Sequence, residues 1–119
     1  MAPRPQWFRL DTALFDNPKL LRAIQAGGHG AALLWIQSIG YSARHLTDGW
    51  VPLPLPKQWG YTHKHCQALT SSGLWIPLEI TDDGGWLIND YNDYQPTRAE
   101  WEARAEKGRA AALRRWGAR

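Results

Sequence analysis

The sequence has few of the residues that build covalent or metal-bound frameworks. Its 119 residues include a single cysteine, Cys66. One cysteine excludes an intrachain disulfide framework and a zinc site with several cysteine ligands, and it fits the reducing conditions of a cytoplasm. We therefore expect a cytoplasmic protein whose fold is stabilised by a hydrophobic core.

Long hydrophobic runs are also missing. No apolar stretch approaches the ~18 to 20 residues that a membrane-spanning helix needs, and the first residues lack the apolar segment of a secretory signal. We expect a soluble protein with no membrane partner. At this length one domain with an appendage fits, whereas two full domains do not.

Motifs of catalysis and cofactor binding are lacking too. We find no phosphate-binding glycine fingerprint, no nucleophile motif and no paired carboxylates of the kind used in two-metal phosphodiester chemistry. His63 and His65 lie about 200° apart on a helix and diverge, and His63 and Cys66 face together without a second pair of ligands. We expect no enzymatic activity, no cofactor and no metal.

Acidic residues are scarce near the end of the chain, where the positive charge collects. The net charge is +3, and residues 1–90 contain seven basic and seven acidic residues. Residues 91–119 contain seven basic and four acidic residues. A basic end on a neutral domain suits a polyanion such as nucleic acid. The alternative is a solvated helix whose charge only aids solubility.

Cap residues and apolar spacing predict two helices in the first half of the chain. Asn17 and the following proline favour a helix over residues 18–26, and a second, central helix is expected over residues 30–45. The residues expected to face inward are Leu20, Leu21 and Ile24, then Leu33, Ile36, either Ile39 or Gly40, and Ala43, with Leu34 and Trp35 beside them. Six tryptophans are expected to build the core: Trp7, Trp35, Trp50, Trp59, Trp75 and Trp86.

Shorter elements are expected after the second helix. They are a strand at residues 50–52, a helix at 56–59, a turn at Gly60, and a helix at 63–72 that Thr62 caps and Gly73 ends. Two strand-prone runs, 74–80 and 85–89, with turn residues 81–84 between them, predict a hairpin.

This order of elements is that of a winged helix-turn-helix. In that architecture the helix after the tight turn enters the major groove of DNA, and the hairpin forms a wing. We predict an α+β fold with a winged helix-turn-helix domain at residues 1–96, including a two-stranded wing, and a basic helical tail at residues 97–119. The expected partner is double-stranded DNA.

The side chains expected to contact DNA form two groups. The first lies on and just before the helix at 63–72 and supplies groups for base edges and phosphates: Gln58, Tyr61, Thr62, His63, Lys64, His65, Gln67 and Ser71. The second lies in the tail and would hold phosphates: Arg98, Arg104, Lys107, Arg109, Arg114, Arg115 and Arg119. Asp82 and Asp83 at the wing tip would be repelled by phosphate, so the wing is expected to point away.

Several short motifs resemble those of a known family. WFRLD at 7–11, LFDNPK at 14–19, ALLW at 32–35 and DG at 48–49 resemble the N-terminal winged-helix domain of phage replisome organisers and DnaD-like replication initiators. NDYNDYQPT at 89–97, before a basic helix, is similar to small helix-turn-helix proteins of actinobacterial phages.

The resemblance implies binding of double-stranded DNA near an origin or promoter, in the bacterial nucleoid. It also implies a homodimer formed through the N-terminal arm. The tail helix offers another route to a homodimer if its apolar side docks on a second copy, and a replication protein of phage or host is a further expected partner. The replication families carry a second domain that this sequence lacks. Transcription regulation is therefore a comparable expectation.

The rival interpretation is a protein-interaction module. The apolar stripe of the tail, which runs through Trp101 and Trp116, would then dock on a host replication or transcription factor. Under this interpretation, DNA affinity would be absent or marginal at physiological salt.

Overall fold

The computed structural model describes residues 4–78 and 84–116 of the chain. Its elements, in chain order, are the 3-10 helix η1 (Thr12–Asp16), α1 (Pro18–Gly27), α2 (His29–His45), β1 (Trp50–Pro52), α3 (Leu55–Gln58), α4 (His63–Ser72), β2 (Trp75–Leu78), β3 (Gly85–Ile88), α5 (Tyr91–Tyr94) and α6 (Arg98–Trp116). The fold is therefore mixed α+β, as expected. Asp82, Asp83 and Arg119 lie outside the described residues.

Local cap signals set the ends of the helices. The side chain of Asn17 accepts a hydrogen bond from the backbone N–H of Lys19 at 2.9 Å, and Pro18 begins α1. Gly28 follows α1 with φ +76°, and Gly73 follows α4 with φ +88°. Both angles lie in the left-handed region that glycine tolerates best. The bounds expected for α4 are confirmed.

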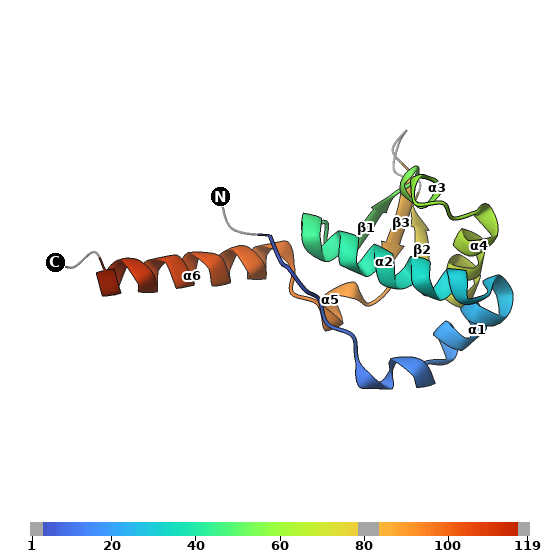
Figure 1. The fold of residues 1–119 in the computed structure, drawn as a ribbon, viewed down its shortest axis with the longest axis horizontal. Coiled ribbons are helices and arrows are strands. Elements are labelled where there is room, and N and C mark those ends of the chain that lie inside the picture. Colours follow the sequence, from blue (N-terminus) through green and yellow to red (C-terminus); the bar gives the residue numbers. More distant parts are fainter. Residues whose placement is uncertain (1–3, 79–83, 117–119) are drawn as a thin grey trace.

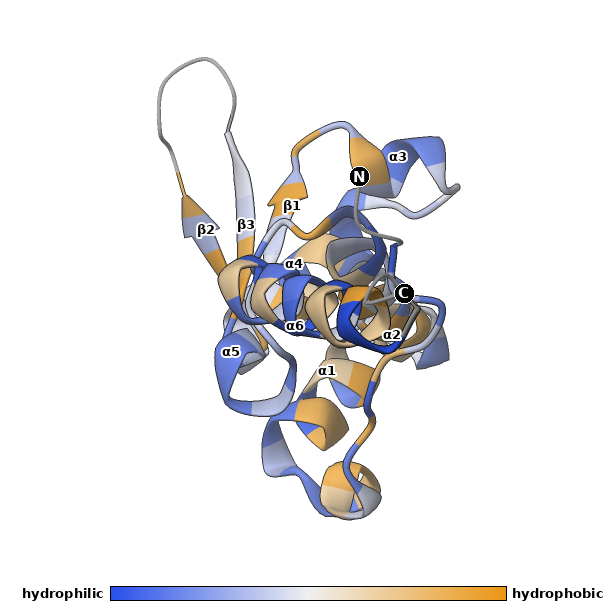
Figure 2. Ribbon diagram, turned by 90° about the vertical axis from the view of Figure 1, so that its left-hand side faces the viewer, coloured by the Kyte–Doolittle hydropathy of each residue, from blue (hydrophilic) through white to orange (hydrophobic). Residues whose placement is uncertain are grey.

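The three strands form one antiparallel sheet in the order β1-β3-β2. Figure 2 shows the strands side by side in this order. Leu87 of β3 lies opposite Trp50 on one side and Ile76 on the other. Pro77, which has no backbone N–H to donate, lies in β2, and β2 is an edge strand because it borders only β3.

Helix α2 runs across the body of the molecule beside the sheet, and α1 and α4 lie near its N-terminal end (Figure 1). The buried side of α2 differs from the apolar stripe that the sequence predicted for this helix. Leu34, Trp35 and Ile39 are buried, whereas Leu33 is 57% exposed. Ile36 and Ala43 are only partly buried.

Two serines explain the difference, because they occupy the buried side of α2. Ser38 and Ser42 are fully buried. The Ser38 hydroxyl accepts a hydrogen bond from Nε1 of Trp75 at 3.2 Å. The Ser42 hydroxyl accepts one from the backbone N–H of Gly49 at 2.6 Å. These bonds satisfy polar groups that would otherwise destabilise the core.

Two other expected core residues lie at the surface. Trp7 is 76% exposed and Leu21 is 47% exposed, so the prediction was wrong for both. Trp35 and Trp75 are buried, at 8% and 1% exposure. In α1 the buried side consists of Leu20, Ala23 and Gly27.

Helices α1 and α4 pack closely at Gly27. A Cβ atom built on Gly27 would lie only 2.7 Å from Cβ of Ala68 on α4. Because real Cβ contacts are longer than this, a glycine lets the two helices approach. This close packing holds α4 with its opposite side turned outward.

The N-terminal arm is bound to the body by Gln95. The backbone N–H of Arg9 donates to Oε1 of Gln95 at 3.0 Å, and Nε2 of Gln95 donates to the carbonyl of Arg9 at 2.5 Å. Phe8, next to Arg9, packs against the core.

Helix α6 extends away from the body (Figure 1). The backbone N–H of Arg98 at its start donates to Oδ1 of Asp48 at 2.7 Å, which attaches the helix to the loop before β1. Thr97 Oγ1 accepts from the backbone N–H of Glu100 at 3.1 Å. The longest dimension of the molecule is 61 Å.

Candidate nucleic-acid interface

The outward side of α4 carries a stripe of polar residues. Lys64, Gln67 and Ser71 are exposed and follow one another at steps of three and four, which places them on one side of a helix. Cys66 and Leu69 face the core. We call Lys64, Gln67 and Ser71 the open stripe of α4.

The start of α4 is fixed by a capping box. Thr62 is the N-cap, and its hydroxyl lies 3.1 Å from Nδ1 of His65. Nδ1 of His65 accepts a hydrogen bond from the backbone N–H of Thr62 at 3.0 Å. The sequence predicted Thr62 as the cap, but His65 takes the place that glutamate or glutamine usually has in this motif. Gly60, with φ +93°, makes the tight turn before it.

Two of the expected contact residues are engaged within the protein. The ring of His65 lies against Gly30, where a Cβ atom would come within 2.6 Å of Nε2. The hydroxyl of Tyr61 donates to Oε1 of Gln37 at 2.7 Å. Burial also raises the pKa of Tyr61. His65 and Tyr61 therefore position α4 instead of projecting with the open stripe.

Helix α1 places Arg22 and Gln25 beside the open stripe. A shallow hollow is lined by Arg22, Gln25, Ala26, Ser71 and Ser72. A second, adjoining hollow is lined by Ala26, Lys64, Gln67, Ala68, Thr70, Ser71 and Pro77. Neither hollow has an acidic residue among the described side chains that line it. Arg22 and Gln25 were not predicted at this surface, because only the packing of α1 on α4 brings them here.

Exposed polar side chains precede α4. Gln58 and Lys57 of α3 are exposed, as is His63 in the first turn of α4. Gln58 and His63 were expected at the interface, whereas Lys57 was not. The interface we consider consists of the open stripe of α4 with Arg22, Gln25, Lys57, Gln58 and His63.

Charge is divided within the part of the chain that was expected to be neutral. Residues 17–72 contain five basic residues and one acidic residue, Asp48. Residues 73–90 contain four acidic residues and no basic one. The equal totals over residues 1–90 concealed this division. Helices α1 to α4 are therefore basic, and the chain around β2 and β3 is acidic.

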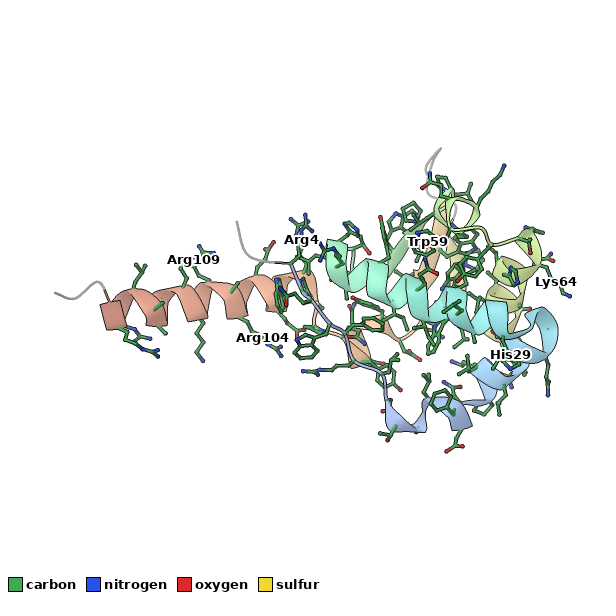
Figure 3. The ribbon with its side chains drawn as sticks, in the orientation of Figure 1. Arg4, His29, Trp59, Lys64, Arg104 and Arg109 are labelled. Atoms are coloured by element: carbon green, nitrogen blue, oxygen red, sulfur yellow. The ribbon has the colours of Figure 1, made fainter. Side chains whose placement is uncertain are left out.

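The basic residues of α6 lie far from the open stripe. Lys64 is near one end of the molecule, while Arg104 and Arg109 lie on the helix that extends toward the other end (Figure 3). Arg98 pairs with Glu102 at 2.9 Å, and Arg109 pairs with Glu106 at 2.8 Å. The expected tail residues within the described range are exposed: Arg98, Arg104, Lys107, Arg109, Arg114 and Arg115.

The residue types that bind metals do not gather in the described part of the chain. No group of three or more His, Cys, Asp or Glu residues that could hold an ion occurs there. Cys66 is buried, and burial raises the pKa of its thiol. The thiolate, the form that binds metals, is therefore disfavoured in the folded protein.

None of the helices in residues 4–78 and 84–116 has the length and apolar character needed to cross a membrane. In comparisons with known proteins, the chain matches no family model, no curated protein and no solved structure.

Proposed function

We propose that this chain binds double-stranded DNA, with α4 entering the major groove. The observation that carries the proposal is the open stripe of α4 beside Arg22, in a stretch of helices with five basic residues and one acidic residue. A protein α-helix fits the major groove of B-form DNA, and basic side chains at its edges can hold the phosphates.

The arrangement of the elements supports a winged helix-turn-helix. Helix α2 precedes β1, the short helix α3 and α4 are joined by the turn at Gly60, and β2 and β3 follow. In this fold the helix after the turn is the one that contacts bases. The sheet order β1-β3-β2 joins the first strand to the strand pair that would form the wing.

Each side chain of the interface has a proposed role. Lys64 and Arg22 hold phosphates, since a positive charge on a flexible side chain suits them. The Gln67 amide can donate to and accept from a base edge, as glutamine does with adenine. Ser71 and His63 supply further polar contacts along the same side of α4.

The pair of strands is proposed to stay off the DNA. Residues 73–90 carry four acidic residues and no basic one, so phosphates repel this part of the chain. The wing would then serve to hold α4 and not to contact the duplex.

The tail is proposed to bind phosphates at a distance from α4. Helix α6 has 19 residues, and such a helix is about 28 Å long. The 61 Å length of the molecule corresponds to about 18 base pairs at the rise of B-form DNA. A short duplex bound to α4 would therefore not reach the end of the tail.

The biological role we propose is control of replication initiation or of transcription, in a phage or its bacterial host. It depends on the short motifs near the start of the chain and around residues 89–97 that resemble phage proteins, together with the proposed DNA interface. The experiment below tests the DNA binding on which either role depends.

The test begins with selection of bound duplexes from a random-sequence pool by the full chain. Fluorescence anisotropy then gives the affinity for a selected duplex and for a scrambled one. We expect the wild type to prefer the selected duplex. Replacing both residues, Lys64→Ala with Gln67→Ala, should reduce that preference by about fivefold or more, since a bidentate base contact contributes about 1–3 kcal/mol to discrimination.

Arg44→Ala is the matched control for the loss of a charge. Arg44 is exposed in the last turn of α2. Gly30, near the start of α2, lies against His65 of α4, and Arg44 lies fourteen residues beyond Gly30, or about 21 Å along the helix. This variant should keep the sequence preference. Equal loss in both variants would contradict the role of α4. No DNA binding at physiological salt would reject the proposal and favour a protein partner.

A further inference from the structure

His65 lies where the first turn of α4 meets α2. Its side chain is partly buried. A Cβ atom built on Gly30, near the start of α2, would lie only 2.6 Å from Nε2 of the His65 ring. The ring also meets that of Tyr61 edge-on, with 5.5 Å between the ring centres. Contacts with two other segments therefore fix the position of this side chain.

The hydrogen bonds of His65 show which ring nitrogen lacks a proton. The backbone N–H of Thr62 donates to Nδ1 at 3.0 Å. Because a backbone N–H can only donate, Nδ1 must accept, and an accepting nitrogen carries no proton. The Thr62 hydroxyl lies 3.1 Å from the same nitrogen. The ring that caps α4 is therefore neutral, with its one proton on Nε2.

Histidine makes this cap sensitive to pH in a way that the usual residue does not. Glutamine, which often completes a capping box, keeps its acceptor over the whole range in which histidine titrates. Histidine gains a proton between about pH 8 and 5, and both ring nitrogens of the charged form are donors. A protonated Nδ1 would face the N–H of Thr62 donor to donor. The hydrogen bond that closes the first turn of α4 would then be lost.

No acidic residue in the helices around His65 would stabilise a charged ring. Between residues 17 and 72 the only acidic residue is Asp48, which follows the far end of α2 and binds the backbone of Arg98. Strand β2, which also packs on α4, has no ionisable residue. The helix dipole and Lys64 already make the start of α4 positive. The other ionisable residues of this region are Lys19 and Arg22 of α1, His29, Tyr41, Arg44 and His45 of α2, Lys57 of α3, Tyr61, and His63 and Cys66 of α4. A proton gained by His65 would therefore add a charge that no carboxylate of these helices balances.

We propose that neutral His65 positions the start of α4 for base contacts, and that its protonation weakens the discrimination between DNA sequences. The inference rests on the proposed binding of DNA by α4. Lys64 and Gln67 lie in the first two turns of α4, so their placement depends on the cap. The cap is present at neutral pH and is lost as the pH falls through the range in which the ring gains its proton.

Acid should change selectivity and overall affinity in opposite directions. Loss of the cap loosens the first turn of α4, which makes the base contacts less specific. Each protonated histidine near the interface adds a positive charge, which strengthens the attraction to phosphates of any sequence. A scrambled duplex should therefore bind more tightly at about pH 5.5 than at about pH 7.5, while the preference for a selected duplex falls.

The test measures the preference for a selected over a scrambled duplex by fluorescence anisotropy, at both pH values and constant ionic strength. In the wild type the preference should fall about fivefold in acid, the factor for about 1 kcal/mol, which is a typical value of an N-terminal cap. His65→Gln retains an acceptor that does not titrate, so the ratio of its preferences at the two pH values should be near one. His29→Gln, at an exposed position, and His63→Gln should both keep the fall seen in the wild type.

A measurement on the chain without DNA tests the cap separately. NMR of the ¹⁵N-labelled chain shows the protonation of each ring nitrogen of His65 and the environment of the Thr62 amide. We expect an unprotonated Nδ1 at about pH 7.5, and a Thr62 amide signal that moves with the same midpoint as the ring of His65. In His65→Gln the Thr62 signal should not titrate.

Several results would overturn the proposal. One is a proton on Nδ1 at neutral pH, and another is a Thr62 signal that does not follow the titration of His65. A third is an equal fall in preference in His65→Gln and the wild type. If no duplex is preferred at either pH while the Thr62 signal follows His65, the proposed function fails, and the regulation of DNA binding fails with it.

Discussion

At the scale of single residues, buried polar side chains define much of this structure. Ser38 and Ser42 on α2 bind Trp75 and Gly49, and Gln95 binds both backbone groups of Arg9. Ser38 and Gln95 join segments that are distant in the sequence, and Ser42 joins α2 to the loop before β1. From the sequence alone, such residues are predicted to lie at the surface, because serine and glutamine are mostly exposed in proteins.

Gln95→Ala should release the N-terminal arm. The two hydrogen bonds to Arg9 would be lost, and a partly buried backbone group left without a partner costs about 1–3 kcal/mol. We expect faster hydrogen exchange at the Arg9 amide and a lower free energy of unfolding in urea. Gln25→Ala, at an exposed position of α1, is the control. Unchanged exchange at Arg9 would show that Gln95 does not hold the arm.

The sequence predicted some residues of the candidate interface but not others, because some positions depend on contacts between distant segments. Lys64, Gln67 and Ser71 were found because one helix and its spacing place them together. His65 and Tyr61 were assigned to the interface from their polarity alone. In the structure they form hydrogen bonds within the protein, His65 with Thr62 and Tyr61 with Gln37. Arg22 depends on contact between two helices, and a single sequence contains no direct signal of such contact.

At the scale of elements, the ends of helices were predicted better than their buried sides. Asn17, Thr62 and Gly73 act on neighbouring residues, so their effect can be derived from local chemistry. The buried side of α2 depends on what packs against it. Its two serines shift the apolar pattern, and Leu33, expected inside, is exposed.

The contact between α1 and α4 can be tested with a pair of glycine variants. Gly27→Ala would bring a Cβ within 2.7 Å of Ala68, and such overpacking costs about 1–3 kcal/mol. A Cβ atom added to Gly108 of α6 would have nothing within 4 Å, so Gly108→Ala should increase helix content, since alanine favours a helix by up to about 1 kcal/mol. Urea unfolding and circular dichroism measure the two effects. Equal stability of Gly27→Ala and wild type would contradict the close packing.

At the scale of the whole molecule, charge and shape together suggest how the chain would lie on DNA. The helices of residues 17–72 are basic, residues 73–90 are acidic, and the basic end of α6 lies away from both. Composition revealed the basic tail but concealed the first two regions, because their charges cancel. The distance between α4 and the tail became clear only from the structure.

The tail should contribute to binding only on long duplexes. Arg114→Ala with Arg115→Ala removes two exposed charges from α6. On a duplex of about 30 base pairs the slope of log K against log salt should fall by about 2, that is about 0.9 for each phosphate contact. On a duplex of about 12 base pairs the slope should not change. An equal fall on both lengths would show that the tail folds back toward α4.

The most direct test of the central claim is a map of the DNA contacts on the protein. Backbone and side-chain NMR signals of the full chain are followed while a selected duplex is added at physiological salt. We predict that the largest changes occur at Lys64, Gln67 and Ser71 of α4 and at Arg22 of α1, with small changes in β2 and β3. Changes confined to α6, or to the strands, would contradict the claim that α4 is the helix that binds DNA.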